Sequence, residues 1–381
     1  MDSAALILGA ETLAGRLEGI LLADPALARL WRTEASLLEA AASAGLEGER
    51  ITVPGMVLRL TGAVAVAEDA RATGMALKIL SVARRPGDPF AAPVGTLRRI
   101  EAAAAPLGRA ADRLEDAELA LVAEAGRPWA QVPILAGWRA AADYALRSRR
   151  ESPVAERLVF MAVEGAARHL RGLSPHAPGP QPEDAGARAL LMPAEGAWVL
   201  APSVALTRNG FRAWSPLSGL PAFLGAASRS LSHDLGHLGG LRHELARLQS
   251  MAAAARGRSR LADLVELVKL QPVVTSAMVM DRLGVTRRTA LSLIGELAGA
   301  GCLVNLTARR AARFWALPSL AARMAPAGAA RRPRGTARRP GESGAHPSRL
   351  REGFDEDRLG RVMAELDAAM TGIDRLLKGR A

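Results

Sequence analysis

Cysteine, aromatic residues and long apolar runs are all scarce in this chain of 381 residues. Its single cysteine, Cys302, excludes a disulfide or a cysteine-based zinc cluster within one chain. No apolar run approaches the roughly 20 residues that cross a bilayer, and no basic stretch of the signal-peptide type follows Met1. We therefore expect a cytoplasmic protein that does not insert into membranes.

The residues that are abundant favour helices. Hydrophobic residues make up 49% of the sequence and are mostly alanine, leucine and valine, whereas aromatic residues make up only 3%. Alanine and leucine are strong helix formers, and the β-branched and aromatic residues that favour strands are sparse. The chain is also longer than one hydrophobic core usually requires. These features predict a mainly α protein with more than one domain and, at most, a small sheet.

Positive charge is concentrated in one part of the chain. Between Arg256 and Arg351 there are 18 Arg and Lys against five Asp and Glu, whereas the rest has 32 against 33. A nearly neutral body with one strongly basic segment is typical of a protein that binds a polyanion, because Lys and Arg displace counterions from phosphates. A surface kept soluble by arginine is the alternative explanation.

Composition and periodicity also suggest how the chain is divided. Four prolines between Ser174 and Pro182 predict a connector, and the Arg-, Pro- and Gly-rich stretch after Pro326 cannot form a core. We expect a helical N-terminal domain at 1–173, a Pro-rich connector at 174–189, a junction and connecting helix at 190–255, a DNA-binding domain at 256–317, a disordered basic linker at 326–351 and an amphipathic helix at 355–377.

Three helical patterns follow one another after Ser259. The first, over 259–270, is amphipathic and stops before a proline. Thr275 then caps a helix over 276–283, which is followed by a turn at Gly284. The inward residues of this second helix are expected to be Ala277, Met280 and Leu283.

The third helix has the position of a recognition helix. Thr286 caps it, it runs over 287–300, and Gly301 ends it in the left-handed conformation. Its expected inward residues are Ala290, Leu293, Ile294 and Leu297. The helix lengths and the glycine in the turn fit a helix-turn-helix, whose second helix enters the major groove of DNA.

A hairpin is expected to follow. Two short apolar stretches, 302–304 and 314–317, flank a basic segment, which predicts a β-hairpin wing. The expected fold class is thus mainly α, with a multi-helix N-terminal domain and a C-terminal winged helix-turn-helix. The candidate DNA-binding residues are Thr286, Arg287, Arg288, Thr289 and Ser292 on the third helix, which would meet bases and phosphates, and Arg309, Arg310 and Arg313 on the hairpin, which would follow the backbone or the minor groove.

These stretches resemble known families at both ends of the chain. Residues 281–290, 297–303 and 307–315 look like the C-terminal winged helix of many Fic-family proteins, and 34–36 with 43–48 resemble the helix and Ser-x-x-x-Glu-Gly pattern before the Fic core. The full layout more closely resembles a group of plasmid-associated alphaproteobacterial proteins. Those proteins have an uncharacterised helical N-terminal domain followed by a helix-turn-helix DNA-binding domain.

The Fic resemblance has two limits. A Fic enzyme needs a His-Pro-Phe-x-x-Gly-Asn-Gly-Arg loop, and the nearest stretch, 233–242, lacks the Pro-Phe, the Asn and the spacing. By analogy, Ser43 and Glu47 would form an anion-responsive motif, whereas on an ordinary helix end they are a cap and a surface carboxylate. We therefore expect neither an enzyme nor a cofactor.

Three histidines lie close together in sequence. His233 and His237 would share one face of a helix and could bind a metal, with His243 and Asp234 nearby. The glycines among them weaken a helix, and no separate carboxylate ligand is evident. We interpret the cluster as a polar junction between domains and expect no metal site.

The C-terminal helix predicts the oligomeric state. Leu359, Val362, Leu366, Ile373 and Leu376 form an apolar stripe that must be buried against the body or a second copy. A helix-turn-helix gains affinity when two copies read adjacent half-sites, so we expect a homodimer. The hypothesis is a sequence-specific double-stranded DNA-binding protein, either a transcriptional regulator or a plasmid-maintenance factor. The alternatives are a Fic-lineage enzyme with altered chemistry and an adaptor whose winged helix binds protein.

Overall fold

The computed structural model describes most of the chain up to Met324. The described residues are 3–49, 51–60, 70–105, 114–149, 152–171, 196–211, 219–255, 259–271, 273–306 and 313–324. The expected connector at 174–189, the basic linker at 326–351 and the C-terminal helix at 355–377 lie outside these residues. The division into domains and the homodimer therefore stay predictions.

Helices dominate the described residues, and the one small sheet lies near their C-terminal end, which confirms the mainly α fold. The N-terminal body contains α1 (Ser3–Ala23), α2 (Pro25–Leu46), α3 (Val53–Leu60), α4 (Ala70–Arg84), α5 (Pro93–Ala104), α6 (Asp116–Gly126), the short 3-10 helix η2 (Arg127–Trp129), α7 (Pro133–Arg147), α8 (Pro153–Leu170) and α9 (Pro202–Arg208). The remainder comprises α10 (Leu220–Ala254), α11 (Leu261–Leu270), β1 (Val273–Thr275), α12 (Ser276–Leu283), α13 (Arg287–Gly299), β2 (Val304–Asn305), β3 (Phe314–Ala316) and α14 (Pro318–Met324).

Helix α8 is the centre of the N-terminal body. Every residue from Val154 to Arg168 is buried, and four of these residues are charged. Helix α7 packs closely against it, because Gly137 has no side chain. A Cβ at Gly137 would lie 2.7 Å from the carbonyl oxygen of Phe160. The surrounding helices bury α8 on all sides, so its charged side chains need partners inside the core.

Arg168 of α8 is surrounded by carboxylates in that core. Its guanidinium donates to Glu164 at 2.7 Å and to Glu18 of α1 at 2.8 Å, and it lies 3.9 Å from Glu11. Burial opposes the charge of Arg168, but Glu164, Glu11 and Glu18 outweigh it and raise its pKa. These ion pairs join α1 to α8.

The pKa of Glu11 predicts a pH-dependent stability. Burial raises it from the ordinary 4.5 to about 7, although Arg168 lowers it in part. Between these pH values the unfolded chain loses the Glu11 proton while the folded chain keeps it. The free energy of unfolding therefore falls as the pH rises from 4.5 to 7, by about 3 kcal/mol at most.

Urea unfolding of the native protein and of Glu11→Gln at pH 5 and pH 7.5 tests this. The glutamine variant lacks the titration, so its stability relative to the native protein should increase at the higher pH. Glu124→Gln changes an exposed carboxylate and serves as the control. The prediction is wrong if the native protein and Glu11→Gln differ in free energy of unfolding by the same amount at pH 5 and at pH 7.5.

Buried carboxylates also support a segment that has no regular structure. Residues 196–201 are buried, and Trp198 donates from Nε1 to the carbonyl oxygen of Ala83 at 2.7 Å. Glu164 accepts from the backbone N–H of Val199, and Glu39 accepts from those at the start of α9. Burial raises the pKa of both glutamates. Their oxygens thus satisfy backbone groups that would otherwise be unpaired in the core.

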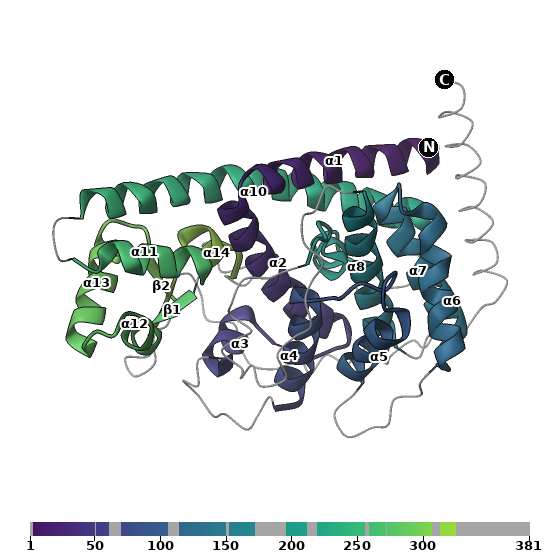
Figure 1. Cartoon of the computed structure of the whole chain (residues 1–381), viewed down its shortest axis with the longest axis horizontal. Coiled ribbons are helices and arrows are strands. Elements are labelled where there is room, and N and C mark those ends of the chain that lie inside the picture. Colours follow the sequence, from purple (N-terminus) through teal and green to yellow (C-terminus); the bar gives the residue numbers. More distant parts are fainter. Residues whose placement is uncertain are drawn as a thin grey trace, which may run out of the picture.

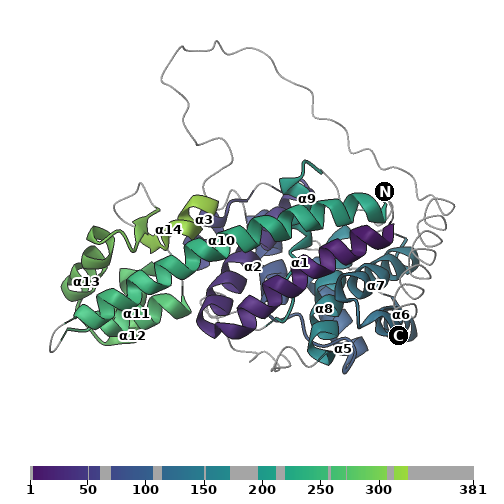
Figure 2. The same cartoon turned by 90° about the horizontal axis from the view of Figure 1, so that it is seen from above.

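Helix α10 connects the N-terminal body with the C-terminal elements. It is 35 residues long, lies beside α1, and also contacts α2, α9, α11 and α14 (Figures 1 and 2). The sequence indicated a connecting helix within 190–255 that glycines weaken near the histidines, yet α10 passes through Gly236, Gly239 and Gly240 without a break. Its buried positions recur with helical periodicity along the whole length, and their burial outweighs the roughly 1 kcal/mol that each glycine costs a helix.

Candidate nucleic-acid interface

The helix-turn-helix consists of α12, a short turn and α13. The Thr275 side chain accepts from the N–H of Met278 and caps α12, as expected. Gly284 ends that helix at φ 63 and ψ 35, a left-handed conformation that glycine adopts without strain. The Thr286 side chain accepts from the N–H of Thr289 and caps α13. The three local signals therefore set the ends of both helices.

Helix α13 is held by the face that the sequence predicted. Its buried residues are Ala290, Leu293, Ile294 and Leu297. Gly301 follows the helix at φ 69, and the Cys302 N–H donates to the Leu297 carbonyl oxygen at 2.8 Å. This last bond closes the helix in the manner of a Schellman motif.

The inward face of α12 was predicted only in part. Met278, Val279 and Leu283 are buried, Met280 is half-buried, and Ala277 is exposed, so the expectation for Ala277 was wrong. Strand β1 directly precedes the helix and sets its rotation, which places Val279 and Leu283 inward at a spacing of four. The adjacent apolar residues from 278 to 280 allowed either rotation in the sequence.

The candidate residues on α13 gather on one exposed surface. Thr286, Arg287, Arg288, Thr289 and Ser292 are all exposed and lie on the N-terminal half of the helix. The hydroxyls of Thr286 and Thr289 are 2.9 Å apart and bond to each other, so they serve first as helix caps. The two arginines and Ser292 are the groups best placed to reach a ligand. We call the set from Thr286 to Ser292 the recognition surface.

The sheet contains one strand more than expected. Its order is β1-β3-β2, with β3 antiparallel to both neighbours. The expected strand at 314–317 corresponds to β3, and the one expected at 302–304 overlaps β2 only at Val304. Strand β1 was not predicted, because its partner β3 lies far along the chain. Phe314, Trp315 and Ala316 of β3 are buried, and Arg313 before them is exposed. Arg309 and Arg310 lie outside the described residues.

Two side chains of α10 hold these elements in place, and the sequence did not indicate them. Arg247 donates to the carbonyl oxygen of Ala300 at the end of α13. Glu244 accepts from the N–H and the hydroxyl of Ser319 at the start of α14, both at 2.7 Å. Burial raises the pKa of Glu244. A third contact, from Arg260 to the carbonyl oxygen of Leu283 at 2.8 Å, holds the end of α12.

The structure gives the three histidines of α10 different surroundings. His237 is largely buried, and its Nε2 lies 3.0 Å from Glu34 of α2, which makes it a polar contact between α10 and α2. His233 is exposed near Asp234, and His243 is exposed further along the helix. Among the described residues, no group of three or more His, Cys, Asp or Glu side chains is arranged to hold a metal.

Ser43 and Glu47 both contact Arg157 of α8, an arrangement that the sequence did not indicate. Ser43 is buried inside α2, and Arg157 of α8 donates to its hydroxyl at 3.1 Å. The same guanidinium donates to Glu47 at 2.8 Å. Ser43 is therefore not a helix cap, and Glu47 pairs with a fully buried arginine. The contact crosses more than a hundred residues of sequence, which explains why local reasoning missed it.

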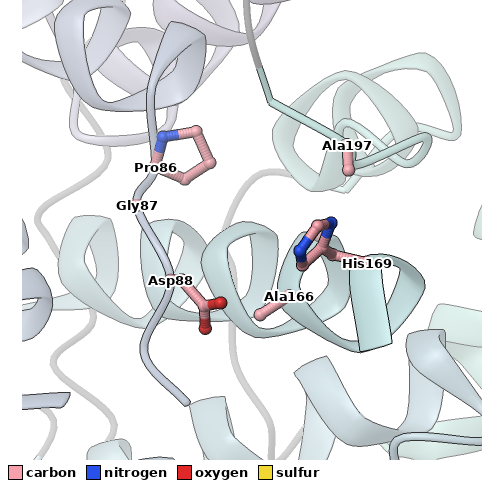
Figure 3. A pocket seen from close by; sticks show the side chains of 7 residues that line it. Pro86, Gly87, Asp88, Ala166, His169 and Ala197 are labelled. Carbon is pink, nitrogen blue, oxygen red and sulfur yellow. The ribbon is translucent and has the colours of Figure 1, made fainter. Parts of the chain in front are cut away.

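A small hollow lies between the loop after α4 and helix α8 (Figure 3). Asp88 and His169 are the polar side chains that line it, among Pro86, Gly87, Gly165, Ala166 and Ala197. The Asp88 carboxylate accepts from the N–H groups of Phe90 and Ala91 and so stabilises the local turn. The hollow has room for about one water molecule, too little for an organic substrate.

The described helices also bear on membrane insertion. None of the helices in the described ranges combines the length and the apolarity that a membrane span requires.

Comparison with known proteins found a family match within the C-terminal segment. Residues 261–317 match the family described as an HTH DNA binding domain, which covers α11 to α13 and the sheet. The comparison with curated proteins gave no match. Among solved structures, a Fic family protein from Desulfovibrio desulfuricans is similar at a TM-score of 0.40 and 11% identity, over 82% of this chain and 95% of that chain. A similarity at this level carries no argument about activity.

Proposed function

We propose that this protein binds double-stranded DNA and reads its sequence through α13. The observation that carries the proposal is the recognition surface, where Arg287, Arg288 and Ser292 stand exposed on the first half of a well-packed helix after the turn. Arginine and serine side chains in the major groove donate to base edges and phosphates. The family match of residues 261–317 supports the same function.

The electrostatics of α13 favour a polyanion. Its first turn contains two arginines and no acidic residue, and the one acidic residue of the helix, Glu296, lies in the second half. The N-terminal end of the helix dipole adds partial positive charge at the same place. A helix-turn-helix that binds only protein would present an apolar or acidic face there. The charge therefore favours DNA over the adaptor alternative.

The hairpin is proposed as a second contact. Strand β3 is buried between β1 and β2, and the Leu306 N–H donates to the Phe314 carbonyl oxygen, so the described residues on both sides of the segment 307–312 belong to the sheet. Arg313 is exposed directly after this segment, whose sequence contains Arg309 and Arg310. In a winged helix-turn-helix these side chains would bind the DNA backbone or the minor groove. A regulatory or plasmid-maintenance role and a homodimer belong to the same proposal.

Binding is expected to depend strongly on salt. Three to five phosphate contacts by arginine predict a slope of about −3 to −4.5 when log affinity is plotted against log salt. Affinity should therefore fall roughly 10²-fold between 50 and 200 mM salt. Fluorescence anisotropy of the full chain with labelled duplexes measures this slope, after selection from a random duplex library identifies a preferred sequence.

The same titration separates the alternatives. Binding that is absent at 50 mM salt, or that does not change with salt, contradicts the proposal and leaves the adaptor function. Binding without enrichment of any sequence in the selection contradicts the sequence-specific part alone. The full chain is the right material, because α10 supplies contacts to both α13 and α14.

A further inference from the structure

An apolar side chain lies on the recognition surface among the charged ones. Leu291 is 40% exposed, although it is in the middle of α13 and follows Arg287 and Arg288 by one helical turn. It is the one large hydrophobic residue of α13 that is exposed. The other leucines and the isoleucine of the helix face the core.

The next turn of α13 is unusually open. Gly295 follows Leu291 at a spacing of four, is exposed, and a Cβ added there would meet no atom within 4 Å. A glycine in an exposed helix interior costs about 1 kcal/mol relative to alanine. The absence of a side chain at this position lets another surface approach the helix backbone beside Leu291.

The chemistry of the surroundings limits what Leu291 can contact. A purely apolar partner would have to desolvate Arg287 and Arg288, which lie within one turn of Leu291. The major groove of DNA suits both kinds of side chain. It presents the acceptors of guanine to arginine and the C5 methyl group of thymine to an apolar side chain.

We propose that Leu291 reads a major-groove methyl group, which makes it a specificity-determining residue. The preferred sequence then contains a thymine within a base pair or two of the guanines contacted by Arg287 or Arg288. This inference rests on the proposed DNA binding and adds an apolar contact to it. The C5 methyl group of thymine packs against the Leu291 side chain, and Gly295 leaves room for the groove beside it.

Replacement of single thymines by deoxyuridine in the selected duplex tests the proposal, since uracil differs only by the missing methyl group. The native full chain should lose about fourfold in affinity at one or two positions, the factor that burial of one methyl-sized group gives. Leu291→Ala should bind the thymine and uracil duplexes equally at those positions. Leu270→Ala, a change of another exposed leucine in α11, should keep the native profile.

The outcomes distinguish this inference from the function on which it rests. If the native protein binds no duplex, DNA binding itself fails. If it selects a sequence but no deoxyuridine position weakens it, or if Leu291→Ala retains the native sensitivity, Leu291 does not read a methyl group. Circular dichroism of both variants verifies that their helices are intact.

Discussion

Alanine at Arg287 and Arg288 is expected to reduce the discrimination between DNA sequences more than the affinity for DNA in general. Both arginines are exposed at the start of α13, where a guanidinium can donate two hydrogen bonds to a guanine. Each lost bidentate contact should lower the preference for the selected duplex over a random one by about 1–3 kcal/mol. Anisotropy titrations with the two duplexes measure this preference.

Two further pairs of substitutions make the result specific. Arg309→Ala with Arg310→Ala should weaken binding to all duplexes alike, because these side chains are proposed to bind the backbone. Arg16→Ala with Arg29→Ala removes the same charge from exposed positions of α1 and α2. This pair should leave the preference for the selected duplex unchanged. If the Arg287/Arg288 variant and the Arg309/Arg310 variant lose the same amount of discrimination, the recognition surface is placed wrongly.

Replacement of Arg168 by methionine is expected to lower the free energy of unfolding by about 3–5 kcal/mol. The substitution keeps the length of the side chain but leaves the carboxylates of Glu11, Glu18 and Glu164 without their shared cation. Urea or thermal unfolding at pH 7.5 measures the loss.

The chain offers a matched control for this substitution. Arg147 of α7 pairs with Asp143 at the same i, i+4 spacing as Arg168 with Glu164, but this pair is only partly buried. Arg147→Met should cost less than about 1 kcal/mol. The Arg168→Met deficit should also shrink at pH 5, because burial raises the pKa of Glu11 to about 7 and its carboxyl is then protonated. Similar losses in both variants, or a deficit that does not change with pH, would mean that the buried ion pairs do not join α1 to α8.

The parts of the fold that depend on neighbouring residues could be predicted from the sequence. Thr275 and Thr286 cap their helices and Gly284 makes the turn, because each needs only a backbone N–H or a left-handed conformation nearby. The inward face of α13 follows from the periodicity of its apolar residues. The exposed candidate residues on α13 follow from the same periodicity.

The parts that depend on distant residues could not be predicted. Strand β1 exists because β3 pairs with it, and β3 comes 40 residues later in the chain. The buried charges of α8 look like surface charges in sequence, since their partners are on α1 and α2. Ala277 was misplaced because β1 sets the rotation of α12. In each case the deciding contact joins segments that are far apart in sequence.

The length of α10 has a mechanical consequence for the proposed DNA complex. A helix of 35 residues is about 50 Å long, and α10 contacts α1 along one part and α11 and α14 along the other. A tilt of about 4° at the α1 contact moves the far end by about 3.5 Å, close to the 3.4 Å rise of one base pair. Because Arg247 ties that end to the C-terminal end of α13, a small repacking of the N-terminal helices would shift α13 by a distance comparable to one base-pair step.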